Sequence, residues 1–157
     1  MRKPLLLGID NPHSENPGAA LLPRPVGSAG HRLFKMSGMT WSEYNATFDR
    51  KNMSDVPLGL RDFTFKDRAV IVLGKSTWIK LGFAAHCQPF SKMIIDQINA
   101  AFYLVPHPSG KNLFYNEPRN QESTTRLLRR IAHDFKDRAR DAQGARKHIP
   151  GKRKHVQ

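Results

Sequence analysis

The stretch from residue 101 to residue 112 constrains the fold of this chain more than any other. Residues 101–105 form a short apolar run of aromatic and branched side chains, which predicts a buried β-strand. Pro106 and Pro108 then flank His107. Because both prolines lack an N–H group and fix their own φ angle, the strand must end there. The imidazole is therefore expected on a stiff loop at the carboxyl end of a strand, where open α/β sheets usually bind ligands. A surface turn with an incidental histidine is the alternative interpretation.

A second strand followed by a loop lies near the start of the sequence. Residues 5–9 are apolar and predict the first strand, and the next residues carry a carboxylate, Asp10, followed by Asn11. Residues 10–25 are rich in proline and too irregular for a regular element, so they predict a long loop that can form a wall of a site.

Capping signals predict where the helices begin. Ser28 is expected to cap a helix that runs to about Ser37, and Thr40 with Glu43 forms a capping box for a second short helix. Ser76 is expected to cap a third helix, to about residue 81. A last helix is expected from residue 118 to about residue 142, with one apolar stripe and arginines on its other faces.

The remaining segments complete an α/β pattern. Residues 69–73 are the clearest strand, residues 46–51 are a weaker one, residues 56–66 predict a loop, and residues 89–95 are ambiguous. Strands that alternate with helices predict a three-layer α/β/α fold with a mainly parallel central sheet. We expect one domain over residues 1–145 and a basic tail over residues 146–157.

The loop with Asp10 and the sequence His107-Pro-Ser together resemble the two active-site motifs of the uracil-DNA glycosylase superfamily. Residues 26–36 are similar to the Gly-x-Ala-Gly helix opening of its bacterial and thermophilic branches, and residues 69–74 are similar to its middle strand. Across residues 5–131 these motifs occur in the same order as in the family. The resemblance implies the family's fold and a monofunctional DNA glycosylase, which hydrolyses the N-glycosidic bond of a flipped base without metal or cofactor.

The charge of the chain favours a polyanionic partner. The net charge is +13, and residues 126–157 contain eleven Lys and Arg against three Asp, which is +8 of that total. Lysine and arginine release counterions when they contact phosphates, so we expect double-stranded DNA as the partner. A basic tail that serves only solubility is the alternative for the last residues.

Cysteine content and hydropathy narrow the class of protein further. A single cysteine, Cys87, excludes a disulfide framework within the chain and an iron–sulfur cluster held by four thiolates. No apolar run approaches eighteen residues and no signal peptide is recognisable, so we expect a soluble, cytoplasmic protein. We also expect a monomer with no metal, no cofactor and no membrane partner.

The resemblance assigns catalytic roles to two residues. When the glycosidic bond breaks, the leaving base gains negative charge and the sugar becomes cation-like, so the site needs a donor at the base oxygen and a carboxylate near C1′. His107 is the candidate donor. Asp10 is the candidate carboxylate that also orients water, with a turn aspartate as the alternative and Asn11 as a substitute if the register shifts by one.

The base pocket departs from the family pattern. The family stacks its base on an aromatic ring where this chain has residues 23–26 (Pro-Arg-Pro-Val), so Phe34 in the next helix is included as a candidate. Asn45 and Asp49 are the candidates for reading the base edge. A carboxylate only accepts hydrogen bonds, so Asp49 would suit the exocyclic amine of a cytosine. An exposed charge beside two cations is the alternative for Asp49.

The residues expected at the DNA backbone follow His107. Ser109 resembles the family's phosphate-contacting serine, and Gly110 lets the loop approach the DNA. Lys111 stands where the family usually has a leucine that fills the gap left by the flipped base, so Asn112 or Leu113 is a candidate for that role. On the last helix, the candidates for phosphate contact are Arg119, Arg126 and Arg130.

Three functions remain open from the sequence. The first is a DNA glycosylase acting on a pyrimidine-type base, either uracil in repair or a bulky modified cytosine, such as glucosylated hydroxymethylcytosine of phage DNA, in antiviral defence. The second is a DNA-binding module of the same fold without catalysis, against which the presence of both Asp10 and His107 argues. The third is a nucleoside hydrolase, which the net charge of +13 disfavours.

Overall fold

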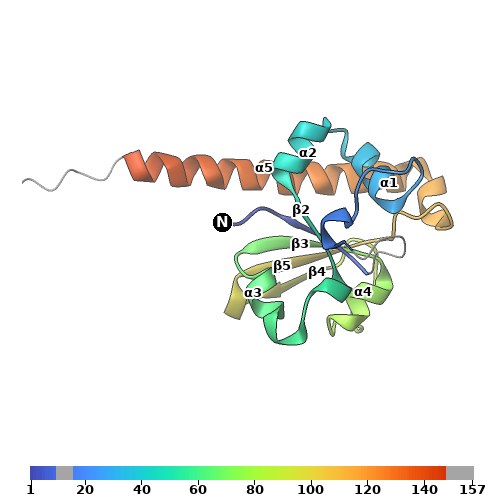
Figure 1. The fold of residues 1–157 in the computed structure, drawn as a ribbon, viewed down its shortest axis with the longest axis horizontal. Coiled ribbons are helices and arrows are strands. Elements are labelled where there is room, and N and C mark those ends of the chain that lie inside the picture. The colour runs from blue at the N-terminus through green and yellow to red at the C-terminus, as the bar shows by residue number, and fades with distance from the viewer. Residues whose placement is uncertain (10–15, 148–157) are drawn as a thin grey trace, which may run out of the picture.

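The structure, a computed structural model, describes residues 1–9 and 16–147 and contains one five-stranded sheet between two groups of helices (Figure 1). The strand order is β2-β1-β3-β5-β4, in which β4 alone is antiparallel to its neighbour. The strands are β1 (Leu5–Gly8), β2 (Asp49–Asn52), β3 (Arg68–Leu73), β4 (Lys92–Ile95) and β5 (Ala100–Val105). The expected α/β fold with a mainly parallel sheet is confirmed.

Alternating side chains of the strands fill two separate cores, one on each face of the sheet. A strand buried on both faces is apolar throughout, and β3 has this pattern over Ala69 to Leu73. One core contains Leu6 and Ile71 and lies under α1 (Ala29–Ser37), α2 (Trp41–Thr47) and α5 (Pro118–Lys147). The opposite core contains Leu5, Leu7 and Trp78 and lies under α3 (Arg61–Phe65) and α4 (Lys75–Lys80).

The predicted caps of the first two helices are confirmed. Ser28 Oγ accepts a hydrogen bond from the His31 N–H at 3.2 Å and starts α1. The Thr40 side chain accepts from the Glu43 N–H, and the Glu43 carboxylate accepts from the Thr40 N–H, each at 3.2 Å, so the capping box of α2 is complete. Short 3-10 helices connect the main elements: η1 (Pro17–Ala19), η2 (Met53–Asp55), η3 (Leu58–Leu60), η4 (Asp96–Ile98) and η5 (Leu113–Asn116).

Several expected boundaries are wrong. The second strand begins only at Asp49, because the residues before it complete α2. The expected loop over residues 56–66 contains η3 and α3, whose Phe65 is buried in the core. Ser76 does not cap α4: Gly74 occupies the N-cap position and no side chain accepts a hydrogen bond there. The ambiguous residues 89–95 contain β4 at the edge of the sheet.

Helix α5 is longer than expected and projects beyond the body of the domain (Figure 1). Its predicted apolar stripe is confirmed in Leu127, Leu128 and Ile131, which are buried, and in Phe135, which is half-buried. Residues 138–146 are all exposed, and the expected boundary between domain and tail falls inside this helix. Among the described residues, no helix combines the length and apolar character needed to cross a bilayer.

Candidate active site at the carboxyl edge of the sheet

The four parallel strands end at one edge of the sheet, which we call the carboxyl edge. The chain passes from β1 to β2 on one side and returns to β3 on the other side of β1. The chain thus reverses its direction across the sheet beside β1. In open α/β sheets the connecting loops part at such a point, and the crevice between them is the usual binding site. The segments that follow β1, β2, β3 and β5 are therefore the natural walls of a site.

The loop after β5 holds His107 through contacts to its backbone. The Tyr115 hydroxyl donates to the Pro106 carbonyl at 2.5 Å, and the Asn112 side-chain amide donates to the His107 carbonyl at 2.9 Å. The Asn112 Oδ1 atom also accepts from the Phe114 N–H at 3.1 Å, which starts η5. Burial raises the pKa of Tyr115 to about 12, so its hydroxyl remains a donor at neutral pH. The stiff loop expected from the two prolines is thus closed by two further side chains.

Gly74 forms the surface on which His107 rests. Its φ angle is +95°, and a Cβ atom added there would lie 3.2 Å from the His107 Cβ. Its N–H donates to the Val105 carbonyl at 2.8 Å, which extends the pairing of β3 and β5 to the start of the histidine loop. The backbone conformation and the close contact both favour glycine at this position.

We expect Gly74→Ala to destabilise the protein by more than the strain of its backbone conformation alone, which is about 1–3 kcal/mol. The excess arises because the new methyl group must displace His107. Gly82→Ala is the matched control, since Gly82 has a φ of +92° and nothing within 4 Å of an added Cβ. Urea unfolding of both variants checks this. Equal losses in the free energy of unfolding would show that Gly74 does not support the histidine.

Asn52, at the end of β2, is a candidate that the sequence analysis missed. Its side chain is 1% exposed, and its Oδ1 atom lies 2.8 Å from the position that a Cβ on Gly8 would occupy. Its Nδ2 group has no hydrogen-bond partner among the described residues. A buried amide donor without a partner is costly, and Asn52 stands at the carboxyl end of its strand, so we include it among the candidate site residues. The carboxyl-end rule would have pointed to Asn52 if the strand had been placed correctly.

The other expected catalytic residue follows β1 at the same edge. The carbonyl of Ile9 accepts from the Ser54 N–H at 3.1 Å, so the backbone is held up to Ile9 beside the segment after β2. Asp10 and Asn11 lie outside the described residues, and their assignment remains a prediction.

Three expected base-binding residues lie elsewhere. Asp49 begins β2 beside Leu5, at the opposite edge of the sheet from His107, and forms an ion pair with the buried Arg68. Asn45 is exposed on α2 and lines a cavity together with Asp49. Phe34 packs edge-on against Trp41 and Tyr44. The structure does not bring these three residues to the histidine loop.

The residues expected at the DNA backbone lie in the histidine loop and on the first half of α5, which follows it. Lys111 is exposed, whereas the Asn112 side chain is used to close the loop. Leu113 is 77% exposed, which leaves it as the apolar candidate for the gap of a flipped base. Ser109 is half-buried and Gly110 is exposed in the same loop, while Arg119, Arg126 and Arg130 are exposed on the first half of α5.

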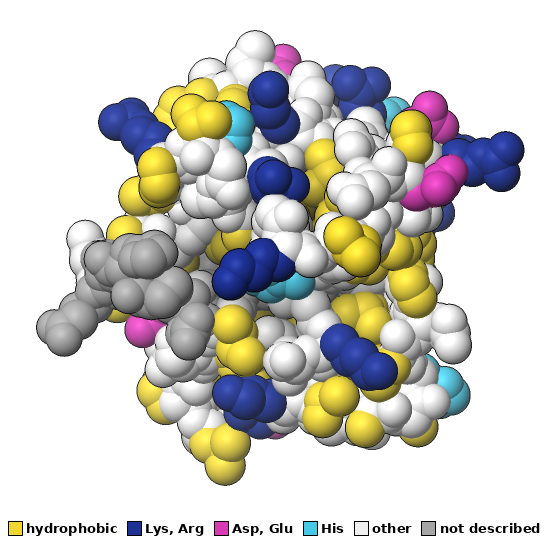
Figure 2. Space-filling model, turned by 90° about the vertical axis from the view of Figure 1, so that its right-hand side faces the viewer, with side chains coloured by type: hydrophobic (Ala, Val, Ile, Leu, Met, Phe, Trp, Pro, Cys, Tyr) yellow, Lys and Arg dark blue, Asp and Glu magenta, His cyan; other side chains and the backbone are white. Residues whose placement is uncertain are grey.

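Arg32 is a cationic residue that the sequence analysis missed. A Cβ on Gly110 would lie 2.9 Å from its Nη2 atom, so the guanidinium reaches over the loop. Arg32 and Lys35 also line a cavity of about 150 Å³ together with Pro108 and Tyr115. They are three residues apart and therefore lie on one side of α1. This spacing in the sequence could have identified them as a pair of cations. Figure 2 shows this end of the molecule, where Lys and Arg side chains predominate and acidic ones lie at the margins.

Comparison with known proteins does not assign a family. A scan against models of protein families finds no match, and a search of curated proteins finds no match. Among the described residues, no three His, Cys, Asp or Glu side chains are grouped to hold a metal ion. The residues at the carboxyl edge are therefore the basis for assigning a function.

Proposed function

We propose that this protein is a DNA glycosylase of the uracil-DNA glycosylase type, which flips a pyrimidine-type base out of duplex DNA and hydrolyses its N-glycosidic bond. One observation carries the proposal: the clamped His107 loop and the Asn52 amide, whose Nδ2 group has no partner among the described residues, lie at the edge where β1 ends, two residues before Asp10 in the sequence. The surrounding surface is basic, as DNA binding requires (Figure 2). The order of these loops supports the resemblance noted in the sequence.

Each residue has a role in this reaction. His107 donates a hydrogen bond to the base oxygen on which negative charge develops, and the rigid loop keeps the donor in place before the reaction begins. Asp10 orients the attacking water and stabilises the cation-like sugar. The products are the free base and an abasic site. Because the loop is held by Tyr115 and Asn112, little reorganisation is needed as the bond breaks.

The side-chain amide of Asn52 reads the base edge in place of Asp49. An amide both donates and accepts, so it can pair with the N3–H and O4 of uracil or with the N3 and exocyclic amine of a cytosine. Residues 24–27, where the family has its stacking ring, are exposed and contain no aromatic side chain, which favours a cytosine with a bulky 5-substituent, as in phage DNA. Uracil is the second candidate, because the amide of Asn52 can donate a hydrogen bond to the O4 atom of uracil and a carboxylate cannot.

The substrate is tested with three DNAs treated in parallel: phage DNA that contains glucosylated hydroxymethylcytosine, DNA that contains uracil, and unmodified DNA. Alkali cleaves the strand at abasic sites, so fragments measure base removal. Cleavage of the glucosylated DNA alone supports the defence function, and cleavage of the uracil DNA alone supports the repair function. Absence of cleavage in all three would contradict the proposal.

Leu113→Ala is expected to slow base release from duplex DNA about tenfold, corresponding to about 1.4 kcal/mol. The exposed leucine fills the stack after the base leaves, so the effect should vanish on single-stranded DNA, where no stack is opened. Single-turnover rates on both substrates provide the measurement. Leu58→Ala is the control, because Leu58 is 75% exposed but lies in η3, far along the chain from the histidine loop. Equal slowing on both substrates would contradict a wedge.

A further inference from the structure

Helix α5 connects the carboxyl edge to the opposite edge of the sheet, which we call the amino edge. Its first half contacts the end of α1: the Thr125 hydroxyl donates to the Met36 carbonyl at 2.7 Å and Arg129 Nε donates to the Ser37 carbonyl at 3.4 Å. Its later residues line a cavity with Arg2 and other residues at the starts of the strands. Thirty helical residues span about 45 Å, so the outer end of α5 lies far from its first residue, Pro118, and projects beyond the sheet (Figure 1).

The amino edge carries its own cationic surface around two cavities. The first cavity has a volume of about 230 Å³. Its lining contains four cationic side chains and one acidic side chain, that of Asp134. The second, of about 450 Å³, has Asp49 as its acidic residue, and that carboxylate is bound to Arg68. We define the amino-edge patch as the exposed or half-buried cations of these linings, which are Arg2, Lys3, Arg50, Lys51, Lys92 and Arg138.

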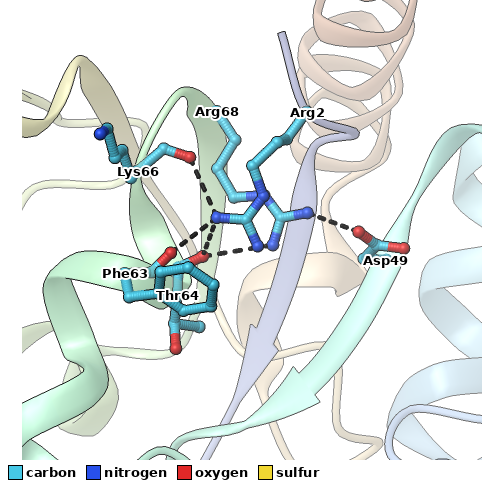
Figure 3. A network of polar contacts seen from close by, with 6 residues as sticks. All are labelled: Arg2, Asp49, Phe63, Thr64, Lys66 and Arg68. Carbon is cyan, nitrogen blue, oxygen red and sulfur yellow. Dashed lines mark hydrogen bonds and ion pairs between the residues drawn. The ribbon is translucent and has the colours of Figure 1, made fainter.

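Two arginines lie between the cavities, and of the two only Arg68 is paired with a carboxylate of the described residues, that of Asp49. The Arg2 guanidinium donates to the carbonyls of Phe63, Thr64 and Lys66, which carry no charge to balance it (Figure 3). Arg68 is 5% exposed, and its Nε group has no hydrogen-bond partner among the described residues. Burial and then the nearby Arg2 lower the pKa of Arg68, against the opposing effect of Asp49. A buried cation that is incompletely paired favours an anionic partner at this edge.

The outer part of α5 extends the same surface. Residues 138–146 are exposed on every side, and three of them are arginines, Arg138, Arg140 and Arg146, against one aspartate, Asp141. Arg138 still contacts the domain, because its Nη1 atom donates to Met1 Sδ at 3.5 Å. The exposed side chains after it extend beyond the domain and can contact a partner. Arginine is suited to phosphate groups because its planar guanidinium forms paired hydrogen bonds with their oxygens.

We propose that the amino-edge patch and the outer part of α5 bind a second segment of duplex DNA while the first occupies the carboxyl edge. This inference rests on the proposed function for the first segment. One short duplex cannot serve both edges, because DNA has a persistence length of about 150 base pairs and resists wrapping around a body of this size. A protein with two such surfaces bridges neighbouring DNA segments and can pass between them without leaving the DNA.

The test uses two unmodified duplexes of about 12 base pairs, each about 41 Å long at 3.4 Å per pair. One duplex is immobilised, and the other is fluorescent and free in solution. The full-length protein is expected to retain the fluorescent duplex on the surface. The variant Arg138→Glu/Arg140→Glu/Arg146→Glu is expected to retain about tenfold less, while its affinity for a single duplex changes by no more than about twofold.

The matched control reverses three charges at the other end of the same helix. Arg119→Glu/Arg126→Glu/Arg130→Glu should weaken binding of the single duplex, because those residues are exposed on the half of α5 that begins just after the histidine loop. Mass measurement of the complex should find one protein with two duplexes. Binding of one duplex without capture of a second, unchanged capture by the outer-helix variant, or two proteins in each bridged complex would each overturn the inference. Failure of the proposed function would appear separately, as absence of base release with capture intact.

Discussion

His107→Ala is expected to slow base release about a hundred- to a thousandfold in single-turnover experiments, with DNA affinity nearly unchanged. The imidazole stabilises charge that develops only in the transition state, so its loss affects the rate rather than the binding of the substrate. The loop itself should survive the substitution, because it is held by the carbonyls of Pro106 and His107 and not by the imidazole alone. Rapid mixing with the substrate that the wild-type protein accepts provides the measurement.

Two further variants separate this role from a general effect of losing a histidine. His107→Gln keeps an N–H donor on the same loop and should recover part of the lost rate. His86→Ala removes an exposed histidine from the connection between α4 and β4 and should leave the rate unchanged. Asp10→Asn should slow the reaction to a similar degree as His107→Ala, because an amide cannot stabilise the cation-like sugar as a carboxylate does. If His107→Ala released the base at nearly the wild-type rate, His107 would have no role in the reaction.

Asn52→Ala is expected to reduce discrimination between the preferred base and other bases by about 1–3 kcal/mol, which is the usual value of one well-placed pair of hydrogen bonds to a base edge. Stability should change little, because the variant removes a buried amide group whose Nδ2 atom has no partner among the described residues. Relative single-turnover rates on the three DNAs, together with urea unfolding, provide both measurements.

The same experiment decides between Asn52 and the residues first expected to read the base. Asn45→Ala should not alter base preference, since Asn45 is exposed on α2 beside Asp49 at the amino edge. Asp49→Asn should instead lower stability, because Asp49 is the carboxylate paired with Arg68. A change of base preference in the Asn45 or Asp49 variant, with none in Asn52→Ala, would contradict the placement of the reading residue on Asn52.

The sequence predicted those parts of the fold whose signals are local. The apolar runs of β3 and β5 and the side-chain caps of α1 and α2 are each contained within a few residues. The strand β2 has no such signal, because its residues Asp49 to Asn52 are all polar and its position is set by pairing with β1. Because this strand was misplaced, the expected base-reading residue Asp49 lies at the opposite edge of the sheet from His107.

The candidate site likewise has parts with a local signal in the sequence and parts without one. The two prolines around His107 were sufficient to predict a stiff loop at a strand end. The contact of His107 with Gly74 and the approach of Arg32 to Gly110 depend on packing between elements that are distant in the chain. The clamp from Tyr115 spans nine residues and depends on the fold of η5 against the loop. The end of α5 at Lys147 could not be predicted either, because the apolar stripe ends at Phe135 and no side chain after it marks where the helix stops.

The most direct test of the glycosylase proposal is to identify the small molecule released from DNA. The DNA that yields alkali-sensitive sites is incubated with the protein, and the filtrate is analysed by mass spectrometry. The proposal predicts a free base in equal amount to the abasic sites, and its loss with His107→Ala. Release of a nucleoside or nucleotide, or alkali-sensitive breaks without any free base, would contradict hydrolysis of the N-glycosidic bond.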